Sequence, residues 1–156
     1  ETGISIRFKE SDVRPMGRTA TGVKAINLSD EDFVIGAGVI DNECKILLVT
    51  DKGFGKCTSY DHYRVQSRGG KGLKTYKITE KTGNLRGLAI VKDNEELIMV
   101  TSEGVVIRIK VKDISTVGRI AQGVKLVNLN EGVSVISMDK IDEQYIDEEE
   151  KEEIEE

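Results

Sequence analysis

The chain of 156 residues carries 23 Lys and Arg against 28 Asp and Glu, and its formal net charge is −5. It has no apolar run near the roughly 18 residues of a membrane-spanning helix, and two cysteines and one histidine are too few for a disulfide framework or a zinc site. Sixteen glycines, a single proline and many β-branched residues favour strands joined by turns.

Charge is divided unevenly along the chain. Residues 139–156 hold eleven acids and two bases, a net −9, which leaves 21 bases and 17 acids, a net +4, over residues 1–138. A basic body with an acidic end favours binding of a polyanion by the body. The acidic end has too few apolar groups to pack, so we predict that it is disordered. Our hypothesis is that it competes with the polyanion for the basic surface.

Three copies of one pattern occupy the body, with a period of about 50 residues. Each copy has a glycine, an arginine fifteen residues later, a second glycine four residues further on, and a lysine two residues after that. The anchors are Gly3, Gly53 and Gly104; Arg18, Arg68 and Arg119; Gly22, Gly72 and Gly123; and Lys24, Lys74 and Lys125. We therefore predict copies at approximately 1–42, 43–94 and 95–138, followed by a tail at 139–156.

Each copy is expected to form four short strands. In chain order, the clearest predicted strands are 4–9, 22–28, 33–40, 46–50, 85–91, 97–101, 105–112 and 133–138. Apolar and polar residues alternate in 4–9 and 105–112, which indicates half-buried antiparallel strands with a wet outer face. Two-residue turns, Asp51-Lys52 and Ser102-Glu103, are suited to tight hairpins between the first two strands of the later copies.

These units predict an all-β fold of propeller-like blades, each with four antiparallel strands. One unit cannot bury both of its faces, so neighbouring units must complete each other's core. The first copy lacks the Leu-rich opening strand, and the chain begins at Glu1 without an initiator Met. We therefore expect further blades upstream in a longer polypeptide. Cys44 and Cys57 are expected to be buried, unreactive thiols in a reducing compartment.

The cations of the repeat are the candidate binding residues. Equivalent cations on successive blades would form a positive track for a bent phosphate backbone, which they would bind without reading base sequence. The predicted contacts are Arg18, Lys24, Arg68, Lys71, Lys74, Arg119 and Lys125, with Arg7, Lys9, Arg108 and Lys110 on outward strand faces. A structural role remains an alternative to phosphate binding for two sets of anchors. The glycines could simply form the turns that enter the third strand, and the arginines could form ion pairs between neighbouring copies. No aromatic stacking platform accompanies the charges, which disfavours single-strand binding.

The sequence contains no recognisable catalytic constellation. A Gly-x-x-x-x-Gly-Lys-Ser/Thr loop, a cluster of metal ligands and a spaced Ser/His/Asp set are all missing. The stretch Gly53-Phe54-Gly55-Lys56 is rich in glycine but is predicted to lie in a hairpin. We therefore predict a binding module with no catalytic residue, metal or cofactor of its own.

Several segments resemble the C-terminal domain family of the DNA gyrase A protein. They are the three copies, the stretch Arg7–Arg14, and the turns Gly17–Val23 and Gly118–Val124. The similarity covers residues 1–138, and an acidic tail is also usual in the family. The family's box, Gln-Arg-Arg-Gly-Gly-Lys-Gly, is most similar to Gln66, Ser67, Arg68, Gly69, Gly70, Lys71 and Gly72. This copy is degenerate because Ser67 stands at the second position of the box.

The resemblance implies a six-bladed β-pinwheel that wraps duplex DNA around a basic rim, with this chain as its last three blades and tail. It implies a parent type II topoisomerase that uses ATP and magnesium to introduce negative supercoils. The implied partners are the rest of gyrase A and the gyrase B protein in an A2B2 assembly, at the nucleoid in the bacterial cytoplasm, with no membrane. Two alternatives are the equivalent domain of topoisomerase IV, and a protein-interaction propeller without a nucleic-acid role.

Overall fold

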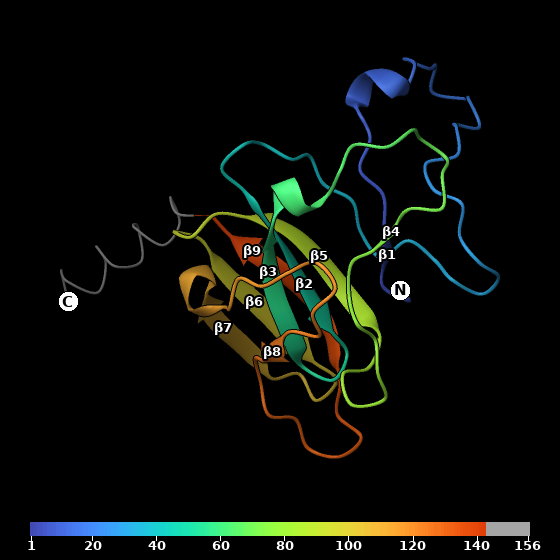
Figure 1. The fold of residues 1–156 in the computed structure, drawn as a ribbon. Coiled ribbons are helices and arrows are strands. Elements are labelled where there is room, and N and C mark those ends of the chain that lie inside the picture. Colours follow the sequence, from blue (N-terminus) through green and yellow to red (C-terminus); the bar gives the residue numbers. More distant parts are fainter. Residues whose placement is uncertain (143–156) are drawn as a thin grey trace.

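The computed structural model describes residues 1–142 and consists of short strands joined by turns (Figure 1). The strands are β1 (Ile4–Ser5), β2 (Lys45–Thr50), β3 (Phe54–Ser59), β4 (Leu73–Lys74), β5 (Leu85–Val91), β6 (Glu96–Thr101), β7 (Val106–Lys110), β8 (Val124–Lys125) and β9 (Val135–Ile141). A short 3-10 helix occurs once in each copy: η1 (Glu10–Asp12), η2 (Tyr60–His62) and η3 (Val111–Asp113). Across residues 1–142, no helix is long and apolar enough to cross a membrane.

The second and third copies build the same antiparallel sheet. β2 lies between β5 and β3, and β6 lies between β9 and β7. The two sheets share an irregularity, because the register shifts between Val49 and Thr50 in one and between Val100 and Thr101 in the other. The predicted all-β fold of repeated antiparallel units is confirmed.

The third strand of each later copy joins the sheet of the preceding copy. β4 pairs with β1 of the first copy, and β8 pairs with β3 of the second. Parallel bridges between Arg7 and Val65 and between Cys57 and Thr116 extend these contacts. The prediction that the third strand completes its own four-stranded unit is therefore wrong. Neighbouring copies are interlocked by exchanged strands of only two residues each.

Side chains on the two faces of β2 enter two separate cores. Leu47 and Val49 pack with Leu97 of the third copy, whereas Ile46 and Leu48 belong to the core shared with the first copy. Successive residues of a strand point to opposite faces, so a continuous apolar run is buried on both sides. The apolar strand predicted at 46–50 therefore lies between the two cores and contributes side chains to both.

The first copy has little regular structure. The predicted strands 22–28 and 33–40 contain no regular strand, and the predicted strand 4–9 is reduced to β1 and a single bridge. In the later copies the fourth strand pairs with the Leu-rich strand of its own copy, β5 with β2 and β9 with β6. The first copy has no such strand within this chain, so residues 33–40 have no strand with which to pair.

Both cysteines are buried free thiols, as predicted. Burial raises the pKa of the Cys57 thiol to about 11 and also raises the pKa of Cys44. The thiolate is the reactive form, so this environment disfavours reaction at either sulfur.

Candidate nucleic-acid interface

Three equivalent segments follow the 3-10 helices, and in the second and third copies they end in the exchanged strands β4 and β8. We call residues 13–25, 63–75 and 114–126 the first, second and third rim segments. Their 3-10 helices, coloured blue, green and orange in Figure 1, succeed one another across the molecule. Each later rim segment is bonded to the preceding copy, since the Gln66 N–H donates to the Arg7 carbonyl (2.8 Å) and the Val117 N–H donates to the Cys57 carbonyl (2.9 Å). The rim is therefore built across junctions between copies.

The degenerate box at residues 66–72 lies within the junction between the first and second copies. The Gly69 N–H donates to the Ala25 carbonyl at 2.7 Å. Gly72 has a φ of 74°, and a Cβ at this position would lie 2.5 Å from the Ser5 carbonyl oxygen. The positive φ supports the alternative that the repeat glycines form turns. The close approach of the Ser5 carbonyl is a second reason why position 72 requires glycine. Among the box side chains, Gln66 and Arg68 are half-buried, while Ser67 and Lys71 are exposed.

Two anchor arginines bind the backbone of the preceding copy. Arg68 donates to the carbonyl of Lys24 and, through Nε at 3.2 Å, to the carbonyl of Asp12. Arg119 donates to the carbonyl of Lys74. These arginines hold neighbouring copies together, as the structural alternative proposed, but their acceptors are carbonyl groups rather than carboxylates.

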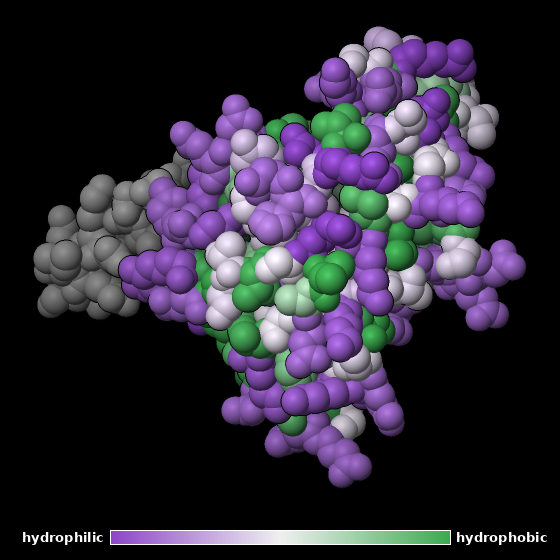
Figure 2. Space-filling view, in the orientation of Figure 1, coloured by the Kyte–Doolittle hydropathy of each residue, from purple (hydrophilic) through white to green (hydrophobic). Residues whose placement is uncertain are grey.

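The other predicted cations of the rim are exposed. They are Arg18, Lys24, Lys71, Lys74 and Lys125. Lys24, Lys74 and Lys125 stand at one repeat position, and none of them forms a salt bridge with another residue of the described range 1–142. Hydrophilic side chains cover much of the face of the molecule shown in Figure 2. The rim therefore presents one equivalent ammonium group per copy.

Phe54 lies beneath two lysines at the second junction. The Nζ atoms of Lys125 and Lys81 lie 5.7 Å and 5.8 Å from the centre of its ring, within the range of a cation–π contact. The sequence interpretation did not include Lys81. It also omitted Arg14 and Arg64, which are exposed on the first and second rim segments. The repeat alignment contained the signal for this pair, because the two arginines are one period apart.

Among the strand cations, Arg7 differs from its prediction. Its guanidinium donates to the carbonyls of Tyr60 (3.2 Å) and Tyr63 (3.0 Å) and lies 5.3 Å from the centre of the Tyr60 ring. The outward position predicted for Arg7 is therefore wrong, because the side chain joins the first copy to the second. Arg108 (ion-paired with Glu96) and Lys110 are exposed on β7, as predicted. Lys9 is also exposed, but it lies directly before η1 and not in a strand.

A buried lysine supports the third rim segment from below. Lys56 has 0% exposure, and its Nζ donates to the carbonyls of Gly118 (3.0 Å) and Arg119 (2.5 Å). It also lies 5.1 Å from the centre of the Tyr76 ring. Burial, with a smaller effect of the Arg119 charge, lowers the pKa of Lys56 to about 8. The sequence interpretation assigned this residue no role beyond its hairpin.

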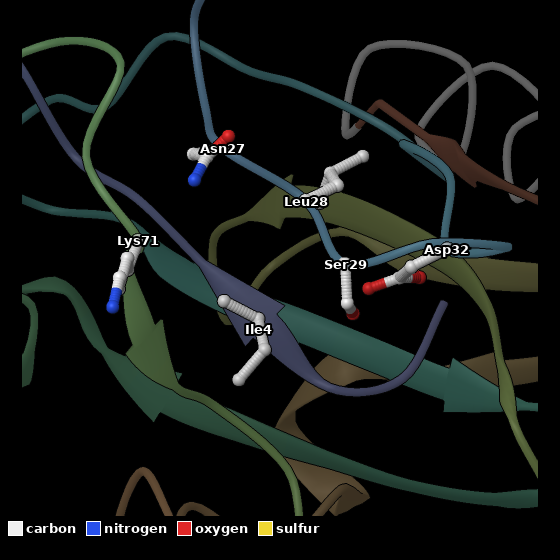
Figure 3. Close-up of a pocket in the computed structure, with 6 residues that line it drawn as sticks. All are labelled: Ile4, Asn27, Leu28, Ser29, Asp32 and Lys71. Carbon is white, nitrogen blue, oxygen red and sulfur yellow. The ribbon is translucent and has the colours of Figure 1, made fainter.

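A shallow hollow of about 270 Å³ lies beside the box lysine (Figure 3). Lys71 and Asp32 lie at opposite ends of it, with Ile4 and Leu28 between them. The Asp32 carboxylate accepts a hydrogen bond from the Thr2 hydroxyl at 2.6 Å. Among residues 1–142, no group of three or more His, Cys, Asp or Glu side chains could hold a metal ion.

Repeated antiparallel sheets, strand exchange between copies and exposed cations on the connecting loops define a propeller-type domain with a basic rim. A protein-family model described as the DNA gyrase C-terminal domain, beta-propeller, matches residues 1–41, 45–92 and 95–142. The chain belongs to this family, which confirms the resemblance found in the sequence.

The curated relatives extend well beyond this chain. The DNA gyrase A protein of Staphylococcus epidermidis is 48% identical over 141 residues, which are 89% of this chain and 16% of the relative. The Ureaplasma parvum protein of the same name is 46% identical over 136 residues, 87% of this chain and 16% of the relative. The chain therefore spans about one sixth of the length of these relatives.

Two solved structures share the fold. The C-terminal domain of DNA topoisomerase IV matches with a TM-score of 0.85 at 23% identity, covering 92% of this chain and 45% of the neighbour. The C-terminal domain of DNA gyrase A matches with a TM-score of 0.83 at 24% identity, covering 90% of this chain and 48% of the neighbour. At these identities the likeness concerns the fold.

Proposed function

We propose that this domain binds duplex DNA along its rim and bends it, as the wrapping domain of a DNA gyrase A protein. The observation that carries the proposal is the set of exposed lysines at one repeat position, Lys24, Lys74 and Lys125. Successive copies are joined by the same strand exchange, so equivalent ammonium groups follow one another along the rim. A bent phosphate backbone presents its charges in the same serial way.

Contact with phosphate fits the chemistry of these side chains. A lysine ammonium is a compact point charge on a flexible stem, which suits a phosphate group more than a base edge. Contacts of this kind provide affinity without sequence readout. In this proposal Arg18, Lys71 and the three equivalent lysines touch DNA, together with Lys9, Arg108 and Lys110. Arg7, Arg68 and Arg119 mainly shape the rim, because their guanidinium groups are already hydrogen-bonded to carbonyls.

The parent protein that this proposal implies is an ATP-dependent, magnesium-requiring topoisomerase that introduces negative supercoils. The domain would deliver wrapped DNA to a cleavage core formed by the rest of gyrase A and by gyrase B, in an A2B2 assembly at the bacterial nucleoid. The names of the curated relatives support a gyrase parent. In this proposal ATP, magnesium and the gyrase B protein act outside this chain.

A second candidate is the equivalent domain of topoisomerase IV. It is favoured by Ser67, which interrupts the box. The two candidates differ in how strongly the domain wraps DNA. Topology of a nicked circle sealed by ligase in the presence of the chain measures that wrapping directly.

The test of DNA binding is a titration of the whole chain with a short duplex across a salt series. We expect binding at low salt, with log K falling by about 0.9 per phosphate contact for each tenfold rise in salt. A second duplex of unrelated sequence should bind with the same affinity. Absence of binding at low salt, or affinity that is independent of salt, would refute the proposal.

A further inference from the structure

Three lysines gather around the turn between β2 and β3, at the junction of the second and third copies. Lys52 belongs to this turn, Lys81 to the loop before β5, and Lys125 to β8, where it pairs with Phe54. All three are exposed, and none forms a salt bridge with another residue of the range 1–142. We call Lys52, Lys81 and Lys125 the turn cluster.

The loop that carries Lys81 is held in one conformation by hydrogen bonds. The hydroxyl of Thr82, a residue with 0% exposure, accepts from the Thr79 N–H at 2.9 Å. The Lys52 ammonium donates to the Glu80 carbonyl and so ties the turn between β2 and β3 to this loop. The backbone that presents Lys81 is therefore ordered before any ligand binds, which lowers the entropic cost of binding.

Phe54 positions two of the three ammonium groups. Its ring is buried, and the Nζ atoms of Lys81 and Lys125 lie 5.8 Å and 5.7 Å from its centre. The two ammonium groups are thus no farther apart than the sum of these distances, which is close to the screening length of about 10 Å at about 0.1 M salt. Like charges at this separation repel each other, and a bound anion would relieve the repulsion.

The first junction has a different structure at the equivalent place. Ile4 stands at the repeat position of Phe54 and pairs with Lys74, as Phe54 pairs with Lys125. No aromatic ring is present there to carry lysines. The hollow of Figure 3 lies beside Ile4, and the Asp32 carboxylate is part of its lining.

The charge of the loop also distinguishes the second copy. Residues 77–83 contain two lysines and one acid, whereas the corresponding residues 27–32 contain three acids and no base. In the third copy, residues 128–132 contain one acid and no base, and Glu103 takes the position of Lys52. The turn cluster is therefore a property of the second copy and does not follow from the repeat.

We propose that the turn cluster binds phosphates of a DNA backbone that continues past Lys125, beyond the rim. The inference rests on the proposed function, because Lys125 belongs both to the equivalent lysines of the rim and to the cluster. That continuity favours a nucleic-acid phosphate over a protein carboxylate as the ligand. The site adds affinity without reading base sequence. At the first junction the acids of residues 27–32 repel the backbone, so the contact ends at Lys74.

Substitution of Lys81 tests the site in the whole chain. Lys81→Ala should weaken binding of a short duplex by about threefold to tenfold at low salt and reduce the slope of log K against log salt by about 0.9. Lys81→Arg keeps the charge and should bind as the wild type does. Equal salt slopes for Lys81→Ala and the wild type would overturn the proposal.

Lys92→Ala is the matched control for net charge. Lys92 follows the opposite end of β5, and its ammonium lies 3.6 Å from carboxylate oxygens of Asp41 and Glu43. Its removal should leave the salt slope unchanged. Equal losses of affinity for Lys81→Ala and Lys92→Ala would show that only net charge matters and would refute a site at the turn.

Acetylation of the whole chain at limiting reagent, with and without saturating duplex, locates the contact. Lys52, Lys81 and Lys125 should lose most of their reactivity when DNA is bound, whereas Lys92 should keep it. Protection of Lys125 alone would refute this inference and leave the proposed function standing, whereas absence of duplex binding at low salt would overturn both. Protection of the cluster without DNA that is lost on removal of residues 143–156 would identify the acidic end as the ligand and refute a phosphate site.

Discussion

Lys56 occupies a position in the second copy at which the other copies have Ile6 and Ile107. Its ammonium is buried between two carbonyls of the third rim segment and has no carboxylate partner among the described residues. Burial of a charge in this way is costly unless hydrogen bonds compensate. The bonds to Gly118 and Arg119 supply that compensation, and they fix the loop on which Arg119 lies.

The pKa of Lys56 predicts a pH dependence of stability. Its folded pKa of about 8 lies below the ordinary value of 10.5, so the unfolded chain binds more protons between these two values. Stability from this group should therefore rise with pH in that window, by at most about 1.4 kcal/mol per pH unit. Lys56→Ile should abolish this component. Urea unfolding of both proteins at pH 7.5 to 9.5 measures this component. If the difference in free energy of unfolding between wild type and variant did not change with pH, the lowered pKa of Lys56 would be contradicted.

Arginine and lysine in the repeat anchors have different environments, and their substitutions should separate stability from DNA binding. Arg68→Ala removes two hydrogen bonds to the first copy and should lower the free energy of unfolding by about 1 to 2 kcal/mol. Lys74→Ala removes an exposed ammonium and should leave stability unchanged. In DNA titrations it should reduce the slope of log K against log salt by about 0.9. Identical salt slopes for Lys74→Ala and the wild type would remove Lys74 from the interface.

At the scale of elements, the exchanged strands are too short to be stable alone. β4 and β8 have two residues each, and they are held in place by the glycine turns before them and by the bridges and hydrogen bonds of the rim segments. Gly123 directly precedes β8 and has a φ of 75°, and a Cβ there would lie 2.4 Å from the Gly55 carbonyl oxygen and 2.8 Å from the Tyr76 hydroxyl. The turn and the close approach require glycine independently.

Substitution of Gly123 should therefore break the junction between the second and third copies. We expect Gly123→Ala to lower the free energy of unfolding by about 2 kcal/mol or more, through backbone strain and collision with β3. Gly118→Ala is the matched control, because a Cβ there meets nothing within 4 Å and its φ is not positive. The control should change stability by less than about 0.5 kcal/mol. Thermal unfolding of both variants decides this, and equal effects would show that position 123 tolerates a side chain.

At the scale of the molecule, the boundary between body and acidic end differs from the prediction. β9 continues to Ile141, which pairs with Glu96, and Lys140 forms an ion pair with Glu95. The predicted tail at 139–156 therefore begins inside a strand, and only residues 143–156 lie outside the described part. These fourteen residues contain nine acids and one base, a net −8, which leaves 22 bases and 19 acids, a net +3, over residues 1–142.

Removal of residues 143–156 tests whether the acidic end competes with DNA. We expect the truncated chain to bind a duplex more tightly at low salt, because a net charge of −8 is removed, and the difference should fade as salt screens it. The truncation spares β9, so its unfolding midpoint should match that of the whole chain. Unchanged affinity at low salt would show that the acidic end does not compete for the rim.

The sequence by itself determined the repeat, the β class, the family and the strands 46–50, 85–91 and 97–101. These depend on local periodicity and on glycine spacing, which are visible along one chain. It could not show that Arg68 and Arg119 bind carbonyl groups, because every residue carries a carbonyl and only packing selects one.

Which sheet receives each third strand was likewise decided by the tertiary structure. The residues of β4 and β8 have the same pattern whether they pair with their own copy or with the preceding one. The direction of the chain after each 3-10 helix places them against the preceding sheet. That exchange positions Lys74 and Lys125 on the rim and buries Lys56 beneath it. The sequence separates a basic body from an acidic end within its net charge of −5, but only the arrangement of the copies shows which cations of the body lie on the rim and which are used to join the copies.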